Sequence, residues 1–341
     1  MTKKSWIWLA GILCSLTTLQ VVGAEQDSSQ QARKLLEKMI VASRNLNYDG
    51  VFVYSRGNQL DTMRIIHKAD EDGEVEKLIS LTGATREVVK GKDDVTCIYS
   101  DNRTVMVDKS GQAGKLLSSN FPESIDRISH FYSFRLLGDD RVAGHDADVI
   151  EVVPKDQNRY IYRFWVDRKT NLMLKSAIMD LQGKILETVL FTHIDTLDEI
   201  PADMVTPMNA SGYSWYTSEK KTDEVQTGSN WKVQWLPHGF LLESVTMQVL
   251  SEGQKPMEHR VYSDGLAMIS IYIERVDASK EGTKAMNGFV SLGAVNAYTM
   301  THGDHQITVV GELPAKTVYK IASSVATDEK ANKSSSSQLL H

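Results

Sequence analysis

The sequence predicts an α+β fold that is mostly antiparallel β-sheet, with a large N-terminal domain and a smaller C-terminal domain. Short runs of alternating apolar and polar residues, separated by turn-forming residues, recur along most of the chain. Helical spacing is confined to a few segments near the two ends and the middle. A polar stretch without either period, residues 209–230, divides the two regions. The length of 341 residues also suits two domains.

The N-terminus has the pattern of a secretory signal peptide. Lys3 and Lys4 precede an apolar run over residues 6–22, and small residues follow at Gly23 and Ala24. This order of a basic start, an apolar run and a small-residue site predicts cleavage after Ala24 and export. The run is shorter than the roughly 20 apolar residues of a membrane span and is broken by polar residues.

The cysteine content argues against a disulfide-stabilised fold, and the net charge argues against a nucleic-acid-binding protein. Removal of the predicted signal also removes Cys14, so Cys97 remains alone and no intramolecular disulfide can form. Cys97 lies in an alternating run and is expected to be a buried, inert strand residue. The formal net charge is −6, and loss of Lys3 and Lys4 makes the chain more acidic. This balance argues against a nucleic-acid partner.

The large domain, residues 25–208, is predicted to begin with a helix capped by Ser28 or Ser29. One apolar face of that helix has helical spacing at Ala32, Leu35, Leu36, Met39 and Ile40. Strands are predicted at residues 50–55, 62–67, 75–81, 85–89, 95–99, 104–107, 148–153, 159–166, 172–179 and 185–193, with a helical piece near 122–131. Such a meander forms an antiparallel sheet with one packed face.

The small domain, residues 231–326, contains the clearest element of the sequence. Residues 261–276, VYSDGLAMISIYIERV, predict a hairpin whose turn is Asp264-Gly265. Alternation places Ala267, Ile269, Ile271 and Ile273 on one buried face, and Met268, Ser270, Tyr272 and Glu274 on the other. Pro314 begins a last helix. Residues 209–230 are predicted to be a linker, and residues 327–341 a disordered tail.

No pattern in the sequence indicates catalysis, a metal or a cofactor. His302 and His305 flank a Gly-Asp turn, but spacing offers no third ligand, so a polar turn is expected. Asp139-Asp140 is interpreted as a turn, because adjacent residues of an extended chain point apart. Nucleophile-elbow, phosphate-loop and zinc-protease motifs are absent from the sequence.

Several segments resemble the RseB/MucB family. They are the hairpin piece VYSDGLA, the segment ITVVGELPAKTVYKIASSV at 307–325, the run WVDRKTNLMLKSAIMDLQGKILE at 165–187, and NYDGVFVYSRG at 47–57. The first two are specific to that family, and the resemblance spans the whole chain. It implies a periplasmic negative regulator of the sigma-E stress response, which binds the periplasmic domain of the anti-sigma factor RseA and protects it from DegS proteolysis.

The resemblance also implies a fold and ligands. The large domain is expected to be a LolA/LolB-like unclosed β-barrel covered by helices, and the small domain to make much of the RseA contact. Lipopolysaccharide or lipoprotein acyl chains are the implied releasing ligands. Self-association into a homo-oligomer is left open.

Two sets of site residues follow from the hairpin and the meander. The predicted partner-facing residues flank or oppose the buried isoleucines: Tyr262, Asp264, Tyr272, Glu274 and Arg275. The predicted lipid-cavity residues are aromatic or methionine residues of the large sheet: Phe52, Tyr54, Tyr162, Phe164 and Met173. Strand alternation fixes which residues share a face but not which face is inside.

Two other classes of function stay open from the residues. A lipid carrier of LolA type would share the apolar cavity but would pass its cargo onward and would not bind an anti-sigma factor. An envelope hydrolase would need a converging nucleophile and base, for which Ser263 beside Asp264 is the weak candidate.

Overall fold

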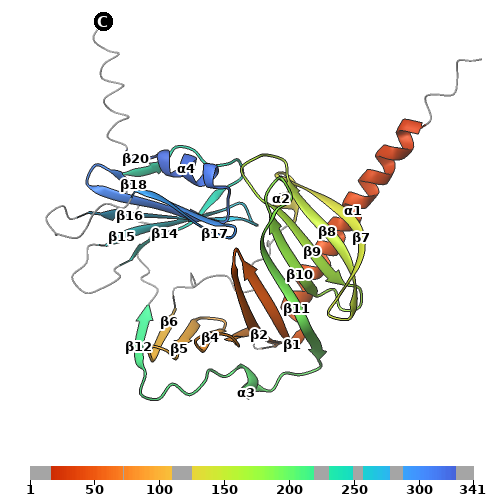
Figure 1. Ribbon diagram of the computed structural model, residues 1–341, viewed down its shortest axis with the longest axis horizontal. Helices are drawn as coiled ribbons and strands as arrows, with labels where there is room; N and C mark the ends of the chain where they lie inside the picture. The colour runs from red at the N-terminus through yellow and green to blue at the C-terminus, as the bar shows by residue number, and fades with distance from the viewer. Residues whose placement is uncertain are drawn as a thin grey trace, which may run out of the picture.

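The computed structural model describes residues 17–71, 73–109, 125–218, 230–248, 256–276 and 287–327, with side chains from residue 27 onward except at residues 218 and 248. A large curved sheet and a smaller sheet domain lie side by side, and the long helix α1 (Thr17–Asn45) runs along the large sheet (Figure 1). No helix in the described ranges is long and apolar enough to cross a membrane. The predicted signal segment up to residue 16 and the tail from residue 328 lie outside these ranges.

The large domain contains a sheet that does not close into a barrel in the described part of the chain. Its strand order is β12-β6-β5-β4-β3-β2-β1-β11-β10-β9-β8-β7. The strands are β1 (Asn47–Arg56), β2 (Gln59–Asp70), β3 (Gly73–Ser80), β4 (Arg86–Lys90), β5 (Val95–Tyr99), β6 (Thr104–Asp108), β7 (Tyr132–Val142), β8 (His145–Pro154), β9 (Ile161–Asp167), β10 (Met173–Met179), β11 (Ile185–Leu197) and β12 (Ser214–Ser218). The pairing is antiparallel except between β12 and β6.

Helix α1 supplies one side of the large core. Its predicted apolar face is confirmed, since Ala32, Leu36 and Met39 are at most 1% exposed and pack with the inward-facing side chains of the sheet. The predicted cap at Ser28 or Ser29 is wrong, because α1 continues back to Thr17 and passes through both positions. Two short helices, α2 (Ile125–Ser129) and α3 (Ala202–Val205), complete the domain.

Strand β7 corrects the predicted turn at Asp139-Asp140. Both aspartates lie inside this strand and pair with Asp148 and Ala147 of β8. The turn comes later, at Ala143 and Gly144. A β-bulge between Leu136 and Gly138 interrupts the regular alternation of β7, which is why the segment does not look like one strand in the sequence.

The predicted linker begins with a strand of the large sheet. β12 pairs in parallel with β6, and Tyr213 just before it packs beside Ile98 and Val105. Trp215 and Tyr216, on the same strand, are each 60% exposed. Residues 219–229 of the predicted linker lie outside the described ranges.

The small domain has its own sheet and its own core. A six-stranded sheet has the order β14-β15-β16-β19-β18-β17, and β13 pairs with β20. These elements are β13 (Trp231–Val233), β14 (Leu241–Gln248), β15 (Met257–Ser263), β16 (Met268–Arg275), β17 (Gly288–Leu292), β18 (Val295–His302), β19 (His305–Gly311), α4 (Ala315–Ser323) and β20 (Val325–Thr327). Pro314 precedes α4 as predicted, and Val318, Ile321 and Ala322 are fully buried.

The predicted hairpin is present as β15 and β16. Its buried row is confirmed, because Ala267, Ile269, Ile271 and Ile273 are at most 3% exposed. The turn is longer than the two predicted residues, since the last strand pair is Ser263 with Met268 and residues 264–267 form the loop. The predicted fold class, mostly antiparallel sheet with an unclosed large domain and a smaller β-rich domain ending in a helix, is confirmed.

Candidate functional site: the joint between the two domains

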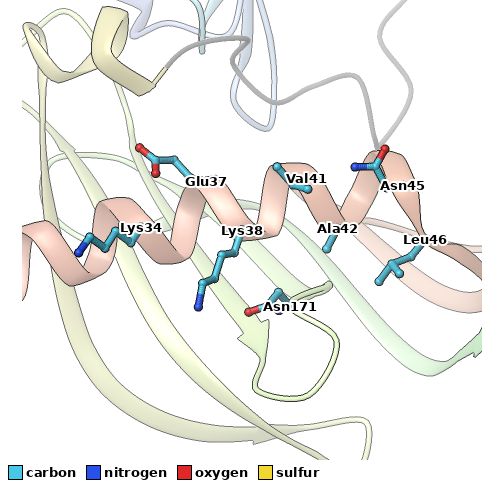
Figure 2. A pocket seen from close by; sticks show the side chains of 8 residues that line it. All are labelled: Lys34, Glu37, Lys38, Val41, Ala42, Asn45, Leu46 and Asn171. Atoms are coloured by element: carbon cyan, nitrogen blue, oxygen red, sulfur yellow. The ribbon is translucent and has the colours of Figure 1, made fainter.

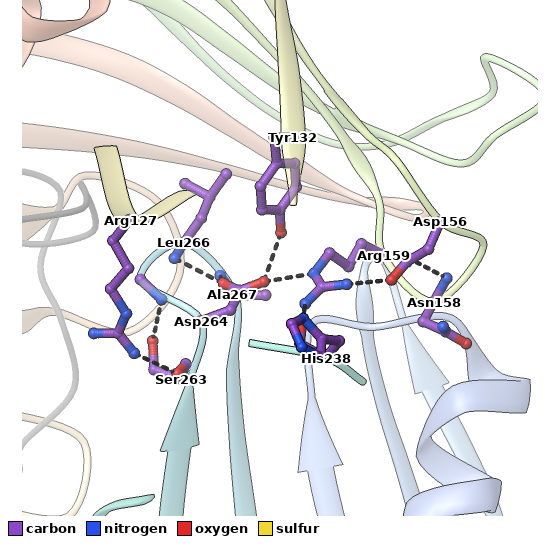
Figure 3. Close-up of polar contacts among 11 residues, drawn as sticks. Arg127, Tyr132, Asp156, Asn158, Arg159, His238, Ser263, Asp264, Leu266 and Ala267 are labelled. Atoms are coloured by element: carbon purple, nitrogen blue, oxygen red, sulfur yellow. Dashed lines mark hydrogen bonds and ion pairs between the residues drawn. The ribbon is translucent and has the colours of Figure 1, made fainter. Parts of the chain in front are cut away.

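Three turns of the small domain dock on the large domain, and we call this interface the joint. The turns, in the order described below, are residues 263–267, 293–296 and 238–240, and they contact α2, the starts of β7 and β9, and the strands β1 and β11. Figure 3 shows the hydrogen bonds and ion pairs at the turns 238–240 and 263–267. The joint therefore connects the two cores through side-chain hydrogen bonds and through Leu266 of the small domain, which packs against the large core.

Asp264 is the centre of the first turn. Its Oδ1 accepts hydrogen bonds from the backbone N–H groups of Leu266 (2.9 Å) and Ala267 (2.8 Å), which is how an aspartate stabilises a turn of its own chain. Its Oδ2 accepts from Tyr132 Oη at 3.0 Å and from Arg159 Nε at 2.6 Å, both in the large domain. The residue is fully buried, so every one of these contacts is shielded from water.

Arg159 neutralises Asp264 from the other domain. It is 1% exposed, and its guanidinium also donates to His238 O at 2.5 Å and to Asp156. The guanidinium carbon lies over three aromatic rings, at 5.2 Å from Phe240, 5.3 Å from Phe131 and 5.6 Å from Tyr132. Arginine suits this position because its planar group stacks on rings while its N–H groups bond in plane.

Burial shapes the chemistry of this cluster. Burial, with the neighbouring Tyr162 and Asp264, raises the pKa of Tyr132 well above its ordinary value, so the hydroxyl stays protonated and donates to Asp264. Ion pairs of this kind depend on both members, because removal of one leaves the other charged and without compensation. The cluster is therefore suited to fixing the domains in one arrangement.

The second turn docks on Glu187 of β11. The Glu187 carboxylate accepts from Ala294 N at 2.9 Å and from Tyr54 Oη at 2.7 Å, so it joins the small domain to β1. Gly293 has φ +61°, and a Cβ there would lie 2.4 Å from Arg56 Cγ and 2.6 Å from Glu187 Oε1. Only glycine fits this contact without displacement.

A third polar contact lies beside the second turn. Asn296 is 3% exposed, and its Nδ2 donates to Tyr160 Oη at 2.9 Å in the large domain and to Leu313 O at 2.7 Å in its own. Nearby, Lys316 Nζ donates to Gln157 Oε1 at 3.3 Å on the surface. The side chain of Asn296 thus connects β9, β18 and the segment before α4.

The structure divides the five predicted partner-facing residues into two groups. Tyr262 is 7% exposed within the small-domain core, and Asp264 lies inside the joint, so neither is on the surface and both predictions are corrected. Tyr262 is covered by the core of its own domain, and Asp264 is covered because the hairpin turn lies against the large domain. Tyr272 stacks on His259 with ring centroids 4.3 Å apart, and Glu274 accepts from Gln306.

Arg275 is the most open of the five. Its Nε donates to Asp304 at 2.6 Å, and the two side chains are 61% and 54% exposed. Tyr272 and Glu274 are partly exposed on the face of the small sheet away from its isoleucines. A partner role for these three residues stays a prediction.

The predicted cavity residues lie between the large sheet and α1. Phe52, Tyr162, Phe164 and Met173 are 3–6% exposed and belong to one packed cluster with the inner face of the helix. Tyr54 is partly buried and donates a hydrogen bond to Glu187 in the joint. Its burial raises its pKa most, and the negative charge of Glu187 raises it further. Their role in lipid binding stays a prediction.

An open hollow of the structure lies elsewhere. It runs along α1 beside the turn that carries Asn171, and Figure 2 shows its lining side chains on the helix. The lining residues are Lys34, Glu37, Lys38, Val41, Ala42, Asn45, Leu46 and Asn171. None of the five predicted cavity residues is among them.

Two other predicted sites take ordinary structural roles. His302 and His305 face each other across the end of the β18–β19 hairpin, as expected, and both rings contact the edge of Trp231 at centroid distances of 5.7 and 5.1 Å. Cys97 on β5 is partly buried, and burial raises the pKa of its thiol, which disfavours the reactive thiolate.

Sequence reasoning missed the large-domain half of the joint. Tyr132, Arg159 and Glu187 are far apart in the chain and look like ordinary strand residues. The Asp-Gly pair at 264 and 265 was visible as a turn, but its partner across the domain boundary had no local signal.

Comparison with known proteins identifies the family. A family model described as the MucB/RseB N-terminal domain matches residues 31–209, and one described as the MucB/RseB C-terminal domain matches residues 225–326. The chain belongs to the MucB/RseB family. The resemblance predicted from the sequence is therefore confirmed.

Individual relatives match across nearly the whole chain. The sigma factor AlgU regulatory protein MucB of Pseudomonas aeruginosa is 31% identical over 323 residues, which cover 94% of this chain and 98% of the relative. The sigma-E factor regulatory protein RseB of Escherichia coli K12 is 27% identical over 333 residues, covering 95% and 98%.

Solved structures of the family agree with these matches. A structure of the Pseudomonas aeruginosa MucA/MucB complex matches with 29% identity and a TM-score of 0.68, over 87% of this chain and 99% of that chain. A crystal structure of MucB matches with 27% identity and a TM-score of 0.62, over 88% and 98%. In this MucB/RseB member the joint connects the two matched regions, with Arg159 and Glu187 in the first and Asp264 and Gly293 in the second.

Proposed function

We propose that this chain binds the periplasmic segment of a membrane-spanning anti-sigma factor of the RseA or MucA kind and protects it from DegS-type proteolysis, which keeps the sigma-E stress response off. The observation that carries the proposal is the likeness to MucB in the solved MucA/MucB complex, which extends over 99% of that chain. Both domains of this chain are therefore represented in a protein that holds such a segment. The role is occlusion rather than chemistry.

The exposed end of β16 is the proposed contact surface. Tyr272, Glu274 and Arg275 present an aromatic ring and both signs of charge near the C-terminal end of β16, an interior strand of the small sheet. Tyrosine and arginine are the residue types that most often carry binding energy at protein interfaces. Tyr262 and Asp264 are excluded from this surface by their burial.

Titration calorimetry with the purified periplasmic segment of the anti-sigma factor from the same organism tests the proposal. We expect one segment bound per chain, with affinity lowered about tenfold or more by Arg275→Ala or Tyr272→Ala, as for interface hot spots. Arg168→Ala is the matched control, because Arg168 also forms an exposed ion pair, with Asp148 at 2.6 Å, but on the large domain.

Failure to bind the segment at all would contradict the proposed function. Binding that none of the β16 substitutions changes would contradict only the proposed surface. Pull-down of the segment by the chain with and without the region after residue 230 then assigns the contact to a domain.

We propose a periplasmic location on the strength of the N-terminal signal pattern. N-terminal sequencing of the protein recovered from the periplasmic fraction should give a chain that begins at Glu25. A chain that retains residues 1–24, or one recovered from the cytoplasm, would contradict cleavage and export.

We further propose that lipopolysaccharide or lipoprotein acyl chains release the partner. A lipid that binds the partner-free form more tightly must weaken partner binding by the same factor. Lipopolysaccharide titrated into the complex should therefore raise the apparent Kd for the segment, and the segment should raise the Kd for the lipid equally. An unchanged Kd in the first titration would contradict release by lipid.

The hydrolase alternative loses its candidate residues. Ser263 is fully buried, its Oγ accepts from Gly265 N at 2.9 Å, and the adjacent Asp264 is occupied by Arg159. A nucleophile and base need access to substrate, which neither residue has in this arrangement. This supports a regulatory rather than an enzymatic role.

A further inference from the structure

Three metal-ligating side chains meet at the end of α1, away from the joint. His67 on β2 lies directly opposite Glu76 on β3, and Glu74 lies two residues before Glu76 on the same face of β3. One donor atom from each of the three lies within 4.8 Å of the others. His67 and Glu76 are at most 1% exposed, while the Glu74 side chain is 35% exposed and opens the cluster to solvent.

The hydrogen bond at Nδ1 of His67 determines which ring nitrogen is free to bind a metal. His67 Nδ1 lies 2.8 Å from the carbonyl oxygen of Leu46, just beyond the last turn of α1. A carbonyl oxygen only accepts, so Nδ1 must carry the hydrogen. In a neutral ring, Nε2 then holds a lone pair, which is the form that binds a metal.

That lone pair points into the cluster. His67 Nε2 is buried without a hydrogen-bond partner and lies 3.3 Å from a carboxylate oxygen of Glu74. The His67 ring is buried, and two acceptors at this distance repel one another unless a cation lies between them. The cation is either a second proton on the ring or a metal ion.

The surroundings favour the metal ion. A metal-bound histidine typically donates its other N–H to a backbone carbonyl, as His67 does to Leu46. The ring of Tyr48 stacks on His67 at 4.7 Å and 10°, which holds the imidazole plane in place. A divalent ion also matches the charge of two carboxylates, and the C-terminal end of α1 adds a partial negative charge nearby.

We propose that His67, Glu74 and Glu76 form a site for a divalent transition-metal ion, with Zn²⁺ as its best-suited occupant. One imidazole and two carboxylates are a donor set that Zn²⁺ accepts, while Mg²⁺ prefers oxygen ligands alone. Three protein ligands leave a position for water on the open side at Glu74. The ion would connect β2 and β3 beneath the end of α1, independently of the joint.

Titration calorimetry of the full chain, freed of metal by a chelator, with ZnCl₂ and with MgCl₂ tests the site. We expect one Zn²⁺ per chain and no comparable binding of Mg²⁺. His67→Gln and Glu76→Gln should each weaken Zn²⁺ binding by at least about tenfold. Glu74→Gln, at the open side, keeps the test decisive if the buried variants fold poorly.

His193→Gln is the matched control. His193 Nε2 lies 2.9 Å from Asp195, but both side chains are more than 60% exposed, so this surface pair should leave Zn²⁺ binding unchanged. X-ray absorption of the zinc-loaded chain should show nitrogen and oxygen ligands at about 2.0 to 2.2 Å.

Three results of the calorimetry would overturn the site. They are the absence of Zn²⁺ binding, Zn²⁺ binding that survives both His67→Gln and Glu74→Gln, and Zn²⁺ binding lost in His193→Gln instead. Nitrogen NMR that finds both ring nitrogens of His67 protonated in saturating Zn²⁺ would show that the cation is a proton and would also overturn it.

Discussion

Two ion pairs of the same length show how burial decides what a charged residue does. Arg159 Nε lies 2.6 Å from Asp264, and Arg275 Nε lies 2.6 Å from Asp304. The first pair is at most 1% exposed and crosses the joint, while the second is more than half exposed on the small domain. Water screens the exposed pair and solvates the charge that is left when one member is removed. The buried pair has no such access to water.

Asp264→Ala should therefore destabilise the protein by about 3–5 kcal/mol, because it leaves the Arg159 charge buried and unpaired. Urea unfolding followed by tryptophan fluorescence measures the loss. Asp304→Ala, which breaks the exposed pair, is the control and should lower stability far less. Equal losses in the two variants would contradict the role assigned to the joint.

His259 predicts a pH dependence at the residue scale. Burial lowers the pKa of His259, so the unfolded chain binds the proton more readily than the folded chain does. Stability should then rise with pH, and the His259 contribution is lost as pH falls below the unfolded pKa of about 6.5.

Urea midpoints measured between about pH 7.5 and 5.5 test this. His259→Gln should flatten the decline toward acid, whereas His193→Gln, at an exposed histidine, should not. A decline with the same slope in His259→Gln as in the natural chain would assign the titration to other groups.

At the scale of elements, the β15–β16 hairpin serves two structures at once. Its strands bury Ile269, Ile271 and Ile273 in the small-domain core, and its turn places Asp264 in the joint. The alternation of the strands predicts the first role directly, because one side chain in two faces the core. The second role depends on where the other domain lies, and no alternation encodes that.

The turn before β18 allows a matched test of the joint. Gly293 and Gly303 have nearly equal φ values, +61° and +62°, but only at Gly293 would a Cβ collide with the other domain. Gly293→Ala and Gly303→Ala should share the backbone cost of about 1–2 kcal/mol, and only the first should loosen the joint.

Interdomain distances from paired spin labels, one on each domain, measure the loosening. We expect a broadened or shifted distance distribution in Gly293→Ala and an unchanged one in Gly303→Ala. A Gly293→Ala chain with the distribution of the natural protein would show that the turn tolerates the collision by local adjustment.

At the scale of the molecule, two independent cores are held in one arrangement by the joint. The large core lies between the curved sheet and α1, and the small core lies between the six-stranded sheet and α4. Polar contacts at an interface between domains are easier to break and remake than a continuous apolar core. Any change in the arrangement of the two domains would therefore have to break the contacts of the joint.

Combining Asp264→Ala with Gly293→Ala tests whether the joint acts as a unit. If the first substitution already separates the domains, the second has less to break, and the combined loss of stability should be smaller than the sum. We expect an interaction energy of about 0.5–3 kcal/mol from the double-mutant cycle in urea unfolding. If the losses of stability in the two single variants simply add in the double variant, the two turns hold the domains together independently.

The sequence by itself determined the local features of this protein. Periodic spacing of apolar residues and the turn-forming residues between the periodic runs are local signals, each contained in a few residues. They predict the apolar face of α1, most strands, the isoleucine row of β16 and the start of α4 at Pro314. The signal pattern at the N-terminus is local in the same way. The bulged strand β7, with Asp139 and Asp140 inside it, escaped because a bulge breaks the period on which the prediction depends.

Only the tertiary structure decided what the charged and polar residues do. Asp264 was predicted to be a partner-facing turn residue and is buried, because the large domain brings Arg159 and Tyr132 to it. His67 and Glu76 meet because the register of β2 and β3 places them opposite one another. The role of a charged side chain depends on its burial and on partners distant in the chain. Both are fixed only when the sheets pair and the domains dock.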